Sequence, residues 1–225
     1  MVRCCAPGRR RGREDHGSGG WRLPSFLRAG RRPWCDRGQL GAALATVDTG
    51  CFERAAALLE KAIAENATIF TCGNGGSAAI ANHFVCDHTK GVRTDTDILP
   101  RVHSLVANIE INTAIANDIS YDQIFAFQLQ SYAAAGDVLV VVSSSGNSPN
   151  IVAALSQAKA KGMATIAMTG FEGGKACGLA DVALHVKAHN YGVVEDVHQS
   201  LMHALAQFLR QRHMLDRSLI ASRKF

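Results

Sequence analysis

The feature that most restricts the fold is a nearly continuous aliphatic run, Asp137–Val142, that ends in a serine-rich segment, Ser143–Ser148. An uninterrupted aliphatic strand is typical of a parallel sheet that is covered on both faces. A second short apolar run, Thr68–Cys72, ends in a glycine-rich segment, Gly73–Ser77. Two buried strands that each lead into a polar loop predict an α/β protein with helices on both sides of its sheet.

Further apolar segments alternate with segments of helical periodicity. We expect additional strands at Ser104–Ala107, Met163–Thr169 and Val182–Val186. The expected helices are 40–65 (one helix or two), Ser77–Thr89, 110–117, 121–133, Pro149–Lys161 and Val193–Arg212. The alternation predicts right-handed βαβ crossovers and a doubly wound, mostly parallel sheet. Ligands bind beyond the carboxyl ends of the strands in such sheets, which is where both polar loops lie.

Length and composition fit one domain of this kind with extra sequence. The chain has 225 residues and is 47% hydrophobic, which is enough for a buried core. No stretch approaches the roughly 18 uninterrupted apolar residues of a membrane span. The net charge of +5 comes from residues 1–37, which hold ten arginines against three acidic residues, whereas the remaining residues hold 14 basic and 16 acidic ones. We therefore expect no membrane partner and no nucleic-acid partner for the folded part.

Residues 1–37 show neither helical nor strand periodicity. They lack the apolar segment of a secretory signal and are not convincingly amphipathic, as a transit peptide should be. A basic arm for nucleic acid is one alternative, and upstream sequence translated from a mistaken start is another. We favour a disordered, arginine-rich extension over 1–37, one domain with an N-terminal helix over 38–215, and a tail over 216–225.

The seven cysteines form no CxxC pair and no ribbon-like spacing. Several lie within apolar runs, as reduced, buried thiols do. We expect a reducing, cytoplasmic compartment and no disulfide framework.

Both polar loops are suited to binding an anion. The three glycines of Gly73–Ser77 permit positive φ and close approach of a ligand, and Ser77 is placed to cap the next helix. A tight structural turn would also use such glycines. Ser143–Ser148 supplies four hydroxyls, which together with the N–H groups at a helix N-terminus can surround a phosphate monoester without a lysine. A loop with a single serine cap would explain one of these serines but not four, so we expect phosphate binding here.

Four motifs follow one another in order: Cys72–Ser77, Ala116–Asp118, Ser143–Ser148, and Thr169-Gly170 with Gly173-Gly174. Together they resemble the SIS (sugar isomerase) domain over about residues 40–212, and within it the bacterial sedoheptulose 7-phosphate isomerases, also called phosphoheptose isomerases. The resemblance implies a flavodoxin-like five-stranded parallel sheet and a homotetramer with active sites between subunits. It also implies a set of substrate-binding residues: Asn74, Gly75, Gly76, Ser77, Asn117, Asp118 and the phosphate-binding Ser143, Ser144, Ser145 and Ser148.

Aldose–ketose isomerisation moves a proton between adjacent carbons through an enediol, which requires a base, an acid and stabilisation of the developing oxyanion. His83 and Asp87 are four residues apart in one expected helix. Glu195 and His203 are eight apart in the last expected helix. Each pair therefore lies on about one helix face, although any one of these residues taken alone is more often an ordinary polar helix residue.

The resemblance implies roles for these side chains. Asp87 corresponds to a catalytic glutamate, the base at the substrate carbons, and His203 corresponds to a catalytic histidine that serves the oxygens. Members of the family can bind zinc at this site, and the matching positions here are His83, Asp87, Glu195 and His203. Two imidazoles and two carboxylates are an acceptable ligand set for one zinc ion per site.

Several residues depart from the family pattern. Asp87 is one methylene shorter than glutamate, and Glu195 replaces the usual glutamine. Asn108 stands where near relatives often have aspartate, and Gly192 replaces another acidic residue. These positions surround the sugar rather than the phosphate, so they bear on which sugar is used more than on the reaction.

Other polar residues near these motifs receive no catalytic assignment. We expect His88 on the surface, and His198 and Gln199 on other sides of the last helix than Glu195. Tyr191 is a candidate to close over the substrate.

The sequence thus predicts an isomerase that converts sedoheptulose 7-phosphate to D-glycero-D-manno-heptose 7-phosphate for lipopolysaccharide and other surface-polysaccharide heptose. One alternative is an isomerase of another sugar phosphate. A second is a non-catalytic scaffold that binds the bacterial replication initiator, which the presence of Asp87 and His203 argues against. A third, a sugar-phosphate-sensing regulator, would need a helix-turn-helix module that residues 1–39 are too irregular to form.

Overall fold

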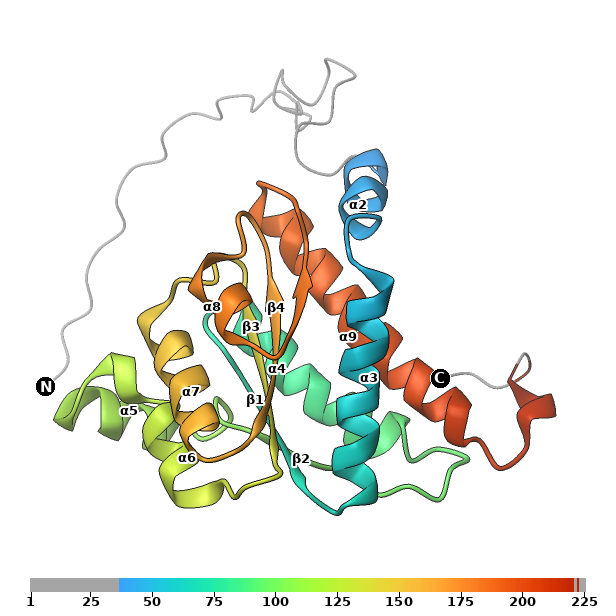
Figure 1. The fold of residues 1–225 in the computed structure, drawn as a ribbon, viewed down its shortest axis with the longest axis horizontal. Coiled ribbons are helices and arrows are strands. Elements are labelled where there is room, and N and C mark those ends of the chain that lie inside the picture. Colours follow the sequence, from blue (N-terminus) through green and yellow to red (C-terminus); the bar gives the residue numbers. More distant parts are fainter. Residues whose placement is uncertain (1–36, 221, 223–225) are drawn as a thin grey trace, which may run out of the picture. The chain divides into compact units, whose positions relative to one another are not determined.

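The computed structural model describes residues 37–220 and 222, and its strands form one parallel sheet in the order β2-β1-β3-β4-β5 (Figure 1). The strands are β1 (Thr68–Gly73), β2 (Arg101–Ser104), β3 (Val138–Ser143), β4 (Ala164–Thr169) and β5 (Val182–His185). The strand order changes direction between β1 and β3, and the carboxyl ends of strands at such a point form the crevice in which these sheets bind ligands. The expected flavodoxin-like, doubly wound α/β fold is confirmed.

Helices cover both faces of the sheet. Their bounds are α2 (Arg37–Leu44), α3 (Thr49–Ala64), α4 (Gly76–Cys86), α5 (Ile109–Asp118), α6 (Ala126–Tyr132), α7 (Pro149–Ala160), α8 (Gly174–Leu179) and α9 (Tyr191–His213), with short turns η1 (Asp87–Gly91), η2 (Tyr121–Gln123) and η3 (Arg217–Leu219). Buried apolar residues of α3, α4 and α9 contribute to one hydrophobic cluster, and buried apolar residues of α5 to α8 contribute to a second.

The central strand β3 separates these two clusters. All six of its residues are buried, and they alternate, with Val138, Val140 and Val142 in the first cluster and Leu139 and Val141 in the second. Because successive side chains of a strand point to opposite faces, a strand covered on both sides must be apolar throughout. This is the physical reason for the aliphatic run.

Most of the expected elements are confirmed, with differences at particular places. The segment 40–65 forms two helices, because Asp48 begins α3 by accepting a hydrogen bond from the Cys51 amide at 2.7 Å. The strand expected at Ser104–Ala107 lies earlier, at Arg101–Ser104, because an edge strand needs no continuous apolar run and Arg101 and His103 are exposed on it. The six-residue helix α8 was not expected from the sequence.

The prediction for residues 1–37 falls on residues outside the described part, apart from Arg37 at the start of α2. The expectation that His88 lies on the surface is wrong. His88 is fully buried in η1, stacked on Phe84 with ring centroids 3.7 Å apart. Among the described residues, no helix has both the length and the apolar character needed to cross a membrane.

Candidate active site

The serine loop lies where the sequence predicts, between the carboxyl end of β3 and the first turn of α7. Pro149 is the first helical residue, as expected. A polar cavity of about 160 Å³ opens here; its lining comprises Asn74, Ser77, Val142, Ser143, Ser144, Ser145, Ser148, Tyr191 and Glu195. The hydroxyl of Ser144 is buried and has no hydrogen-bond partner among the described residues. An unpaired buried donor that faces a polar cavity is suited to an anionic ligand.

The segment that follows β4 is hydrogen-bonded to the backbone of the serine loop. Gly170 donates its amide to the carbonyl of Ser144 at 2.9 Å, and the Ala176 amide donates to the carbonyl of Gly146 at 2.9 Å. Gly146 has a φ of 64°, and a Cβ at this position would collide with the Gly173 carbonyl. The glycines after β4 and in the serine loop therefore permit close packing of two loops, which fixes the shape of the serine-lined cavity.

The glycine loop joins β1 to α4 at the same edge of the sheet. Asn74 exchanges two side-chain hydrogen bonds with the buried Asn150 of α7, both 2.9 Å long. This amide pair ties the glycine loop to the first turn of α7, which directly follows the serine loop. The expectation that Ser77 caps α4 is wrong, because the helix begins at Gly76 with Gly75 as its N-cap. Ser77 instead lies in the first turn, buried, and lines the cavity.

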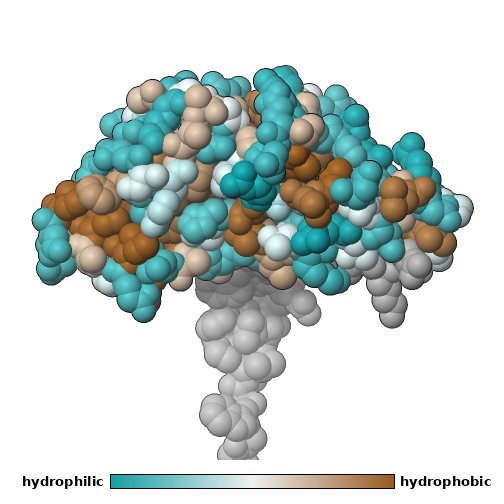
Figure 2. All heavy atoms as spheres, turned by 90° about the horizontal axis from the view of Figure 1, so that it is seen from below, coloured by the Kyte–Doolittle hydropathy of each residue, from teal (hydrophilic) through white to brown (hydrophobic). Residues whose placement is uncertain are grey.

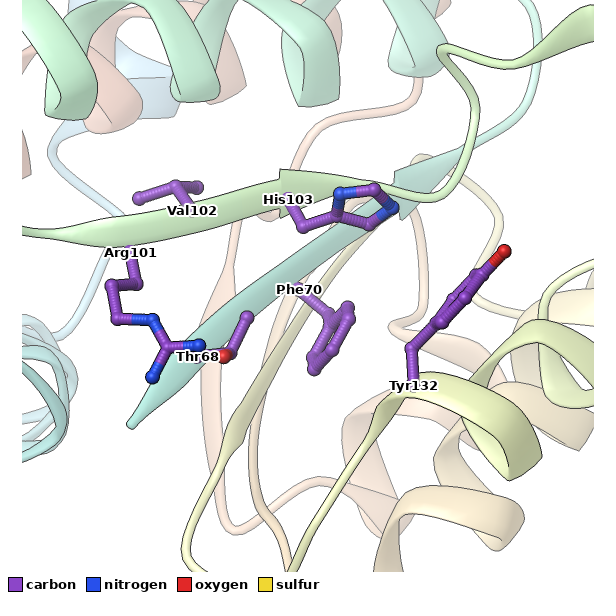
Figure 3. A pocket seen from close by; sticks show the side chains of 6 residues that line it. All are labelled: Thr68, Phe70, Arg101, Val102, His103 and Tyr132. Carbon is purple, nitrogen blue, oxygen red and sulfur yellow. The ribbon is translucent and has the colours of Figure 1, made fainter. Parts of the chain in front are cut away.

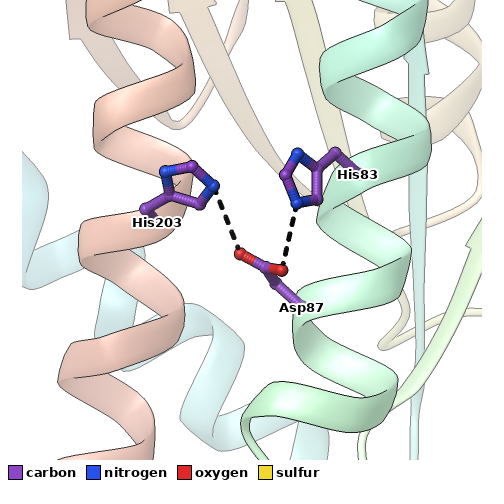
Figure 4. A group of neighbouring side chains, drawn as sticks. All are labelled: His83, Asp87 and His203. Carbon is purple, nitrogen blue, oxygen red and sulfur yellow. Dashed lines mark ion pairs between the residues drawn. The ribbon is translucent and has the colours of Figure 1, made fainter. Parts of the chain in front are cut away.

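Asp87, the first residue of the π-helical turn that follows α4, lies between two histidines (Figure 4). Its Oδ1 is 3.3 Å from His83 Nε2 and its Oδ2 is 3.6 Å from His203 Nε2. The three residues can each offer a ligand atom within 4.8 Å of the others. Asp87 Oδ2 is buried and accepts no hydrogen bond within the described part of the chain. A carboxylate oxygen that faces an imidazole without a hydrogen bond is available to a proton or a cation.

Gln199 also belongs to this group, which the sequence reasoning missed. Its Nε2 lies 2.9 Å from His83 Nδ1 and 3.0 Å from His203 Nε2. Contrary to expectation, Gln199 is on the same face of α9 as Glu195 and His203. The signal was present in the sequence, because positions 195, 199 and 203 are spaced by one helical turn each.

The structure does not bring Glu195 into the group of His83, Asp87 and His203. Glu195 lines the serine cavity, and its carboxylate lies against the glycine loop: a Cβ added at Gly76 would be 2.5 Å from Glu195 Oε2. Glycine at position 76 leaves the space that this carboxylate occupies. Tyr191 lines the same cavity and contacts Phe171 edge-on, with ring centroids 4.7 Å apart.

Comparison with known proteins identifies the family of the chain. A family model for the SIS domain matches residues 39–170. Phosphoheptose isomerases from Nitratidesulfovibrio vulgaris and Vibrio cholerae are 40% and 37% identical to the chain; the matches cover 64% and 71% of this chain and 68% and 83% of the relatives. The solved phosphoheptose isomerase from Neisseria gonorrhoeae superposes with a TM-score of 0.70 at 32% identity, covering 76% of this chain and 91% of that one. That from Francisella tularensis gives 0.72 at 27% identity, covering 77% and 92%.

The chain belongs to the SIS-domain family. The Asn117-Asp118 motif of this SIS domain lies at the end of α5, exposed, with Asn117 Nδ2 donating to Asp118 Oδ1 at 2.8 Å. Neither residue lines the serine cavity of the described structure. Asn108, where near relatives often have aspartate, caps α5 by accepting a hydrogen bond from the Ile111 amide at 2.9 Å.

A larger cavity of this SIS domain, about 310 Å³, lies at the edge strand β2 (Figure 3). Its lining comprises Thr68, Phe70, Arg101, Val102, His103 and Tyr132. It contains none of the predicted site residues, and Thr68 and Arg101 start their strands. Size alone therefore does not identify the site; the smaller polar cavity at the carboxyl ends of β1 and β3 has the relevant chemistry.

Proposed function

We propose that the chain is an aldose–ketose isomerase that converts sedoheptulose 7-phosphate to D-glycero-D-manno-heptose 7-phosphate. The observation that carries this proposal is the pairing of a serine-lined anion cavity with an Asp–His pair supplied by the two helices that border it. α4 starts at the cavity and ends next to Asp87, and α9 carries both the cavity residue Glu195 and His203. The similarity to phosphoheptose isomerases supports the choice of the heptulose as substrate.

The serine loop would bind the 7-phosphate. Ser143, Ser144, Ser145 and Ser148 supply hydroxyls, and the N-termini of α4 and α7 add N–H groups and a favourable dipole for an anion. No lysine or arginine is among the described residues that line the cavity. Phosphate binding by neutral donors fixes one end of the substrate and leaves the charged groups of the site for the chemistry at the other end.

Asp87 and His203 would then move the protons. A base removes the proton from the hydroxymethyl carbon of the ketose and returns it to the neighbouring carbon, and a second group transfers protons between the two oxygens. The carboxylate of Asp87 is mostly shielded from solvent, with 13% of its side chain exposed, whereas the His203 side chain is 39% exposed. This difference supports Asp87 as the base at carbon and His203 as the group at the oxygens.

The donor set of the site fits a zinc ion. Two imidazoles and one carboxylate converge within 4.8 Å, and one carboxylate oxygen is buried without a hydrogen bond. His83, Asp87 and His203 would hold the ion, which matches the preference of zinc for nitrogen and carboxylate ligands. One oxygen of Asp87 and one ring nitrogen of His203 would then stay unbound and carry out the proton transfers. A bound zinc would polarise the substrate carbonyl and favour the negative charge that develops on its oxygen.

We further propose that the protein works as a homotetramer with active sites between subunits. Half of the large exposed apolar side chains in the described part belong to the segment from α5 to α6: Ile109, Ile119, Tyr121, Phe127 and Tyr132. Figure 2 shows apolar side chains gathered at the side where α5 and α6 lie in Figure 1. Such a patch supports burial against another copy of the chain. Ile109→Asp should lower the mass measured by sedimentation, whereas Leu99→Asp, outside the patch, should not; an unchanged mass for Ile109→Asp would count against this interface.

The proposal also covers the boundaries of the domain, the use of the product and the cellular location of the protein. Residues 38–215 would form the SIS domain, and the product would supply heptose for lipopolysaccharide. A cytoplasmic location is supported by the cysteines in the described part (Cys51, Cys72, Cys86 and Cys177), all of which are free thiols. Burial raises the pKa of the Cys72 thiol, which keeps it protonated and inert.

A substrate panel tests the function. Purified protein, with zinc supplied or removed by a chelator, would be incubated with sedoheptulose 7-phosphate and with ribulose, arabinose and fructose phosphates. The proposal expects the highest kcat/KM for the heptulose and loss of activity on zinc removal. Preference for a pentose or hexose phosphate would instead support an isomerase of another sugar phosphate, and inactivity of folded, zinc-supplied protein towards all of them would favour the scaffold.

A further inference from the structure

Three hydrogen-bonded side chains connect the turn η2, the glycine loop and α7. The Tyr121 hydroxyl donates to Asn74 Oδ1 at 3.0 Å. Asn150 Nδ2 donates to the same oxygen, and Asn74 Nδ2 donates to Asn150 Oδ1, each at 2.9 Å. Asn150 is fully buried, Asn74 is half-buried and Tyr121 is exposed, so these bonds lead from the protein interior to its surface.

The hydrogen-bonding capacity that remains on the Asn74 amide determines what this residue offers to a ligand. An amide oxygen accepts two hydrogen bonds and its NH₂ group donates two. In Asn74 both acceptor positions are occupied, by Tyr121 and Asn150, and Asn150 accepts one of the two N–H groups. Because Asn74 lines the serine cavity, it can act there only as a donor, through its second N–H.

A donor at this position suits the cavity. The described lining contains serine hydroxyls and the carboxylate of Glu195, but no lysine or arginine. The Asn74–Asn150 pair alone does not select the donor, because rotation of both amides by half a turn would preserve their two mutual bonds and direct the Asn74 oxygen to the place of its free N–H. The Tyr121 hydroxyl, which donates to Asn74 Oδ1, stabilises the orientation that leaves an N–H for an anion.

We propose that Tyr121 is a positioning residue that acts through Asn74 and keeps an amide N–H available to the anionic group of the substrate. This inference rests on the proposed function, because it concerns binding of the phosphorylated substrate in the same cavity. Asn150, in the first turn of α7 directly after the serine loop, is the buried partner that holds the Asn74 amide in place. The hydroxyl of Tyr121 fixes which end of that amide is free.

Removal of one hydroxyl tests this role without removing an apolar ring from the exposed patch. Tyr121→Phe keeps the ring, and the matched control Tyr132→Phe removes the hydroxyl of another exposed tyrosine in the same patch. The KM and kcat of the zinc-supplied, full-length protein would be measured with sedoheptulose 7-phosphate, and the Kd for inorganic phosphate by calorimetry. A neutral hydrogen bond contributes about 0.5–1.5 kcal/mol, so we expect KM and Kd to rise about 2- to 10-fold in Tyr121→Phe, with kcat unchanged. Tyr132→Phe should behave as wild type.

A double-mutant cycle tests whether Tyr121 acts through Asn74. If it does, Tyr121→Phe should have no further effect on phosphate affinity in protein that already carries Asn74→Ala, because coupled residues are not additive. Thermal melts show whether each variant is folded. If Asn74→Ala fails to fold, Asn74→Ser replaces it in the cycle, since serine has no amide to orient.

Two results would overturn the assignment: unchanged KM and phosphate affinity in Tyr121→Phe, or the same loss of affinity with and without Asn74. A lower mass of Tyr121→Phe in sedimentation, or equal losses in Tyr132→Phe, would assign the effect to the apolar patch and also overturn it. The expected pattern of phosphate affinities in a protein that turns over no sugar phosphate would refute the proposed function and leave the role of Tyr121 intact.

Discussion

Asp87 Oδ2 lies 3.6 Å from Nε2 of His203, although α4 is among the first helices of the domain and α9 is the last. The two helices pack on the same face of the sheet, where Ile80 and Phe84 of α4 share a cluster with Leu201 and Leu205 of α9. The distance between the Asp87 and His203 side chains is therefore set by a buried apolar contact between their helices. Reactive groups held by rigid elements keep the geometry that proton transfer requires.

Removal of either member of this pair should reduce kcat far more than it changes KM. General acid–base groups contribute on the order of 10²–10⁴-fold to rate, so we expect losses of that size for Asp87→Asn and for His203→Ala. Steady-state kinetics with sedoheptulose 7-phosphate gives both constants. Asp122→Asn, an exposed carboxylate of η2, serves as the control and should behave as wild type. A kcat near the wild-type value in Asp87→Asn would contradict the role of Asp87 as base.

Ser144→Ala should affect binding of the substrate phosphate and leave stability unchanged. The hydroxyl of Ser144 is buried without a partner, so its removal costs the folded protein no hydrogen bond. A hydrogen bond to a charged group is worth about 1.5–3 kcal/mol, so KM should rise on the order of 10–100-fold. Ser156→Ala removes an exposed hydroxyl on α7 and should leave KM unchanged. A clear fall in melting temperature for Ser144→Ala, with KM unaffected, would assign this serine a structural role.

Gly146→Ala should destabilise the fold and the proposed phosphate site together. The residue has a φ of 64°, and a Cβ would collide with the Gly173 carbonyl. We expect the free energy of unfolding to fall by more than about 1 kcal/mol, measured by urea denaturation. Gly178→Ala is the matched control, because no atom lies within 4 Å of a Cβ there and the residue is in α8. Equal stability of the two variants would show that the contact between the two loops can adjust.

The free energy of unfolding should fall as the pH is lowered from neutrality. His88 and His198 are buried, and burial lowers the pKa of each from 6.5 to about 4. Between these two values the unfolded chain binds protons that the folded chain does not, so stability is lost as pH falls through this window. The expected slope is roughly 1 kcal/mol per pH unit for each histidine. Urea denaturation across this range measures it.

A variant of one buried histidine provides the control for this slope. His88→Phe should keep the stacking on Phe84 while reducing the acid-side slope, whereas His189→Ala, an exposed histidine, should leave the slope unchanged. A slope that is the same in wild type and in His88→Phe would assign the acid sensitivity to other groups.

The sequence predicted the parts of the fold that are governed by burial on two faces. The run from Val138 to Val142 identified the central strand because each of its side chains must enter one of two cores. The edge strand β2 was predicted at the wrong place, at Ser104–Ala107, because the polar residues Arg101 and His103 interrupt any continuous apolar run in the observed strand. Periodicity also gave no signal for the burial of His88, since a π-helical turn changes which residues face inward.

The structure places some of the candidate site residues together, as the sequence suggested, and others elsewhere. The serine loop and the His83–Asp87–His203 group could be located, because loops at strand ends and i, i+4 spacing are readable in a sequence. The orientation of the Glu195 side chain could not be predicted, because it depends on the space that the missing Cβ of Gly76 leaves for the carboxylate. Gln199 was missed because the family resemblance gave roles only to Glu195 and His203. The four-residue spacing of Gln199 from each of them places it on the same helix face.

The most direct test of the central claim is the conversion of sedoheptulose 7-phosphate followed by proton NMR in deuterated water, with zinc supplied. Isomerisation through an enediol predicts that the aldose heptose 7-phosphate forms with deuterium from the solvent at its second carbon, and that Asp87→Asn abolishes both its formation and the exchange. Folded, zinc-supplied protein that yields no aldose and exchanges no proton of the ketose would contradict the account.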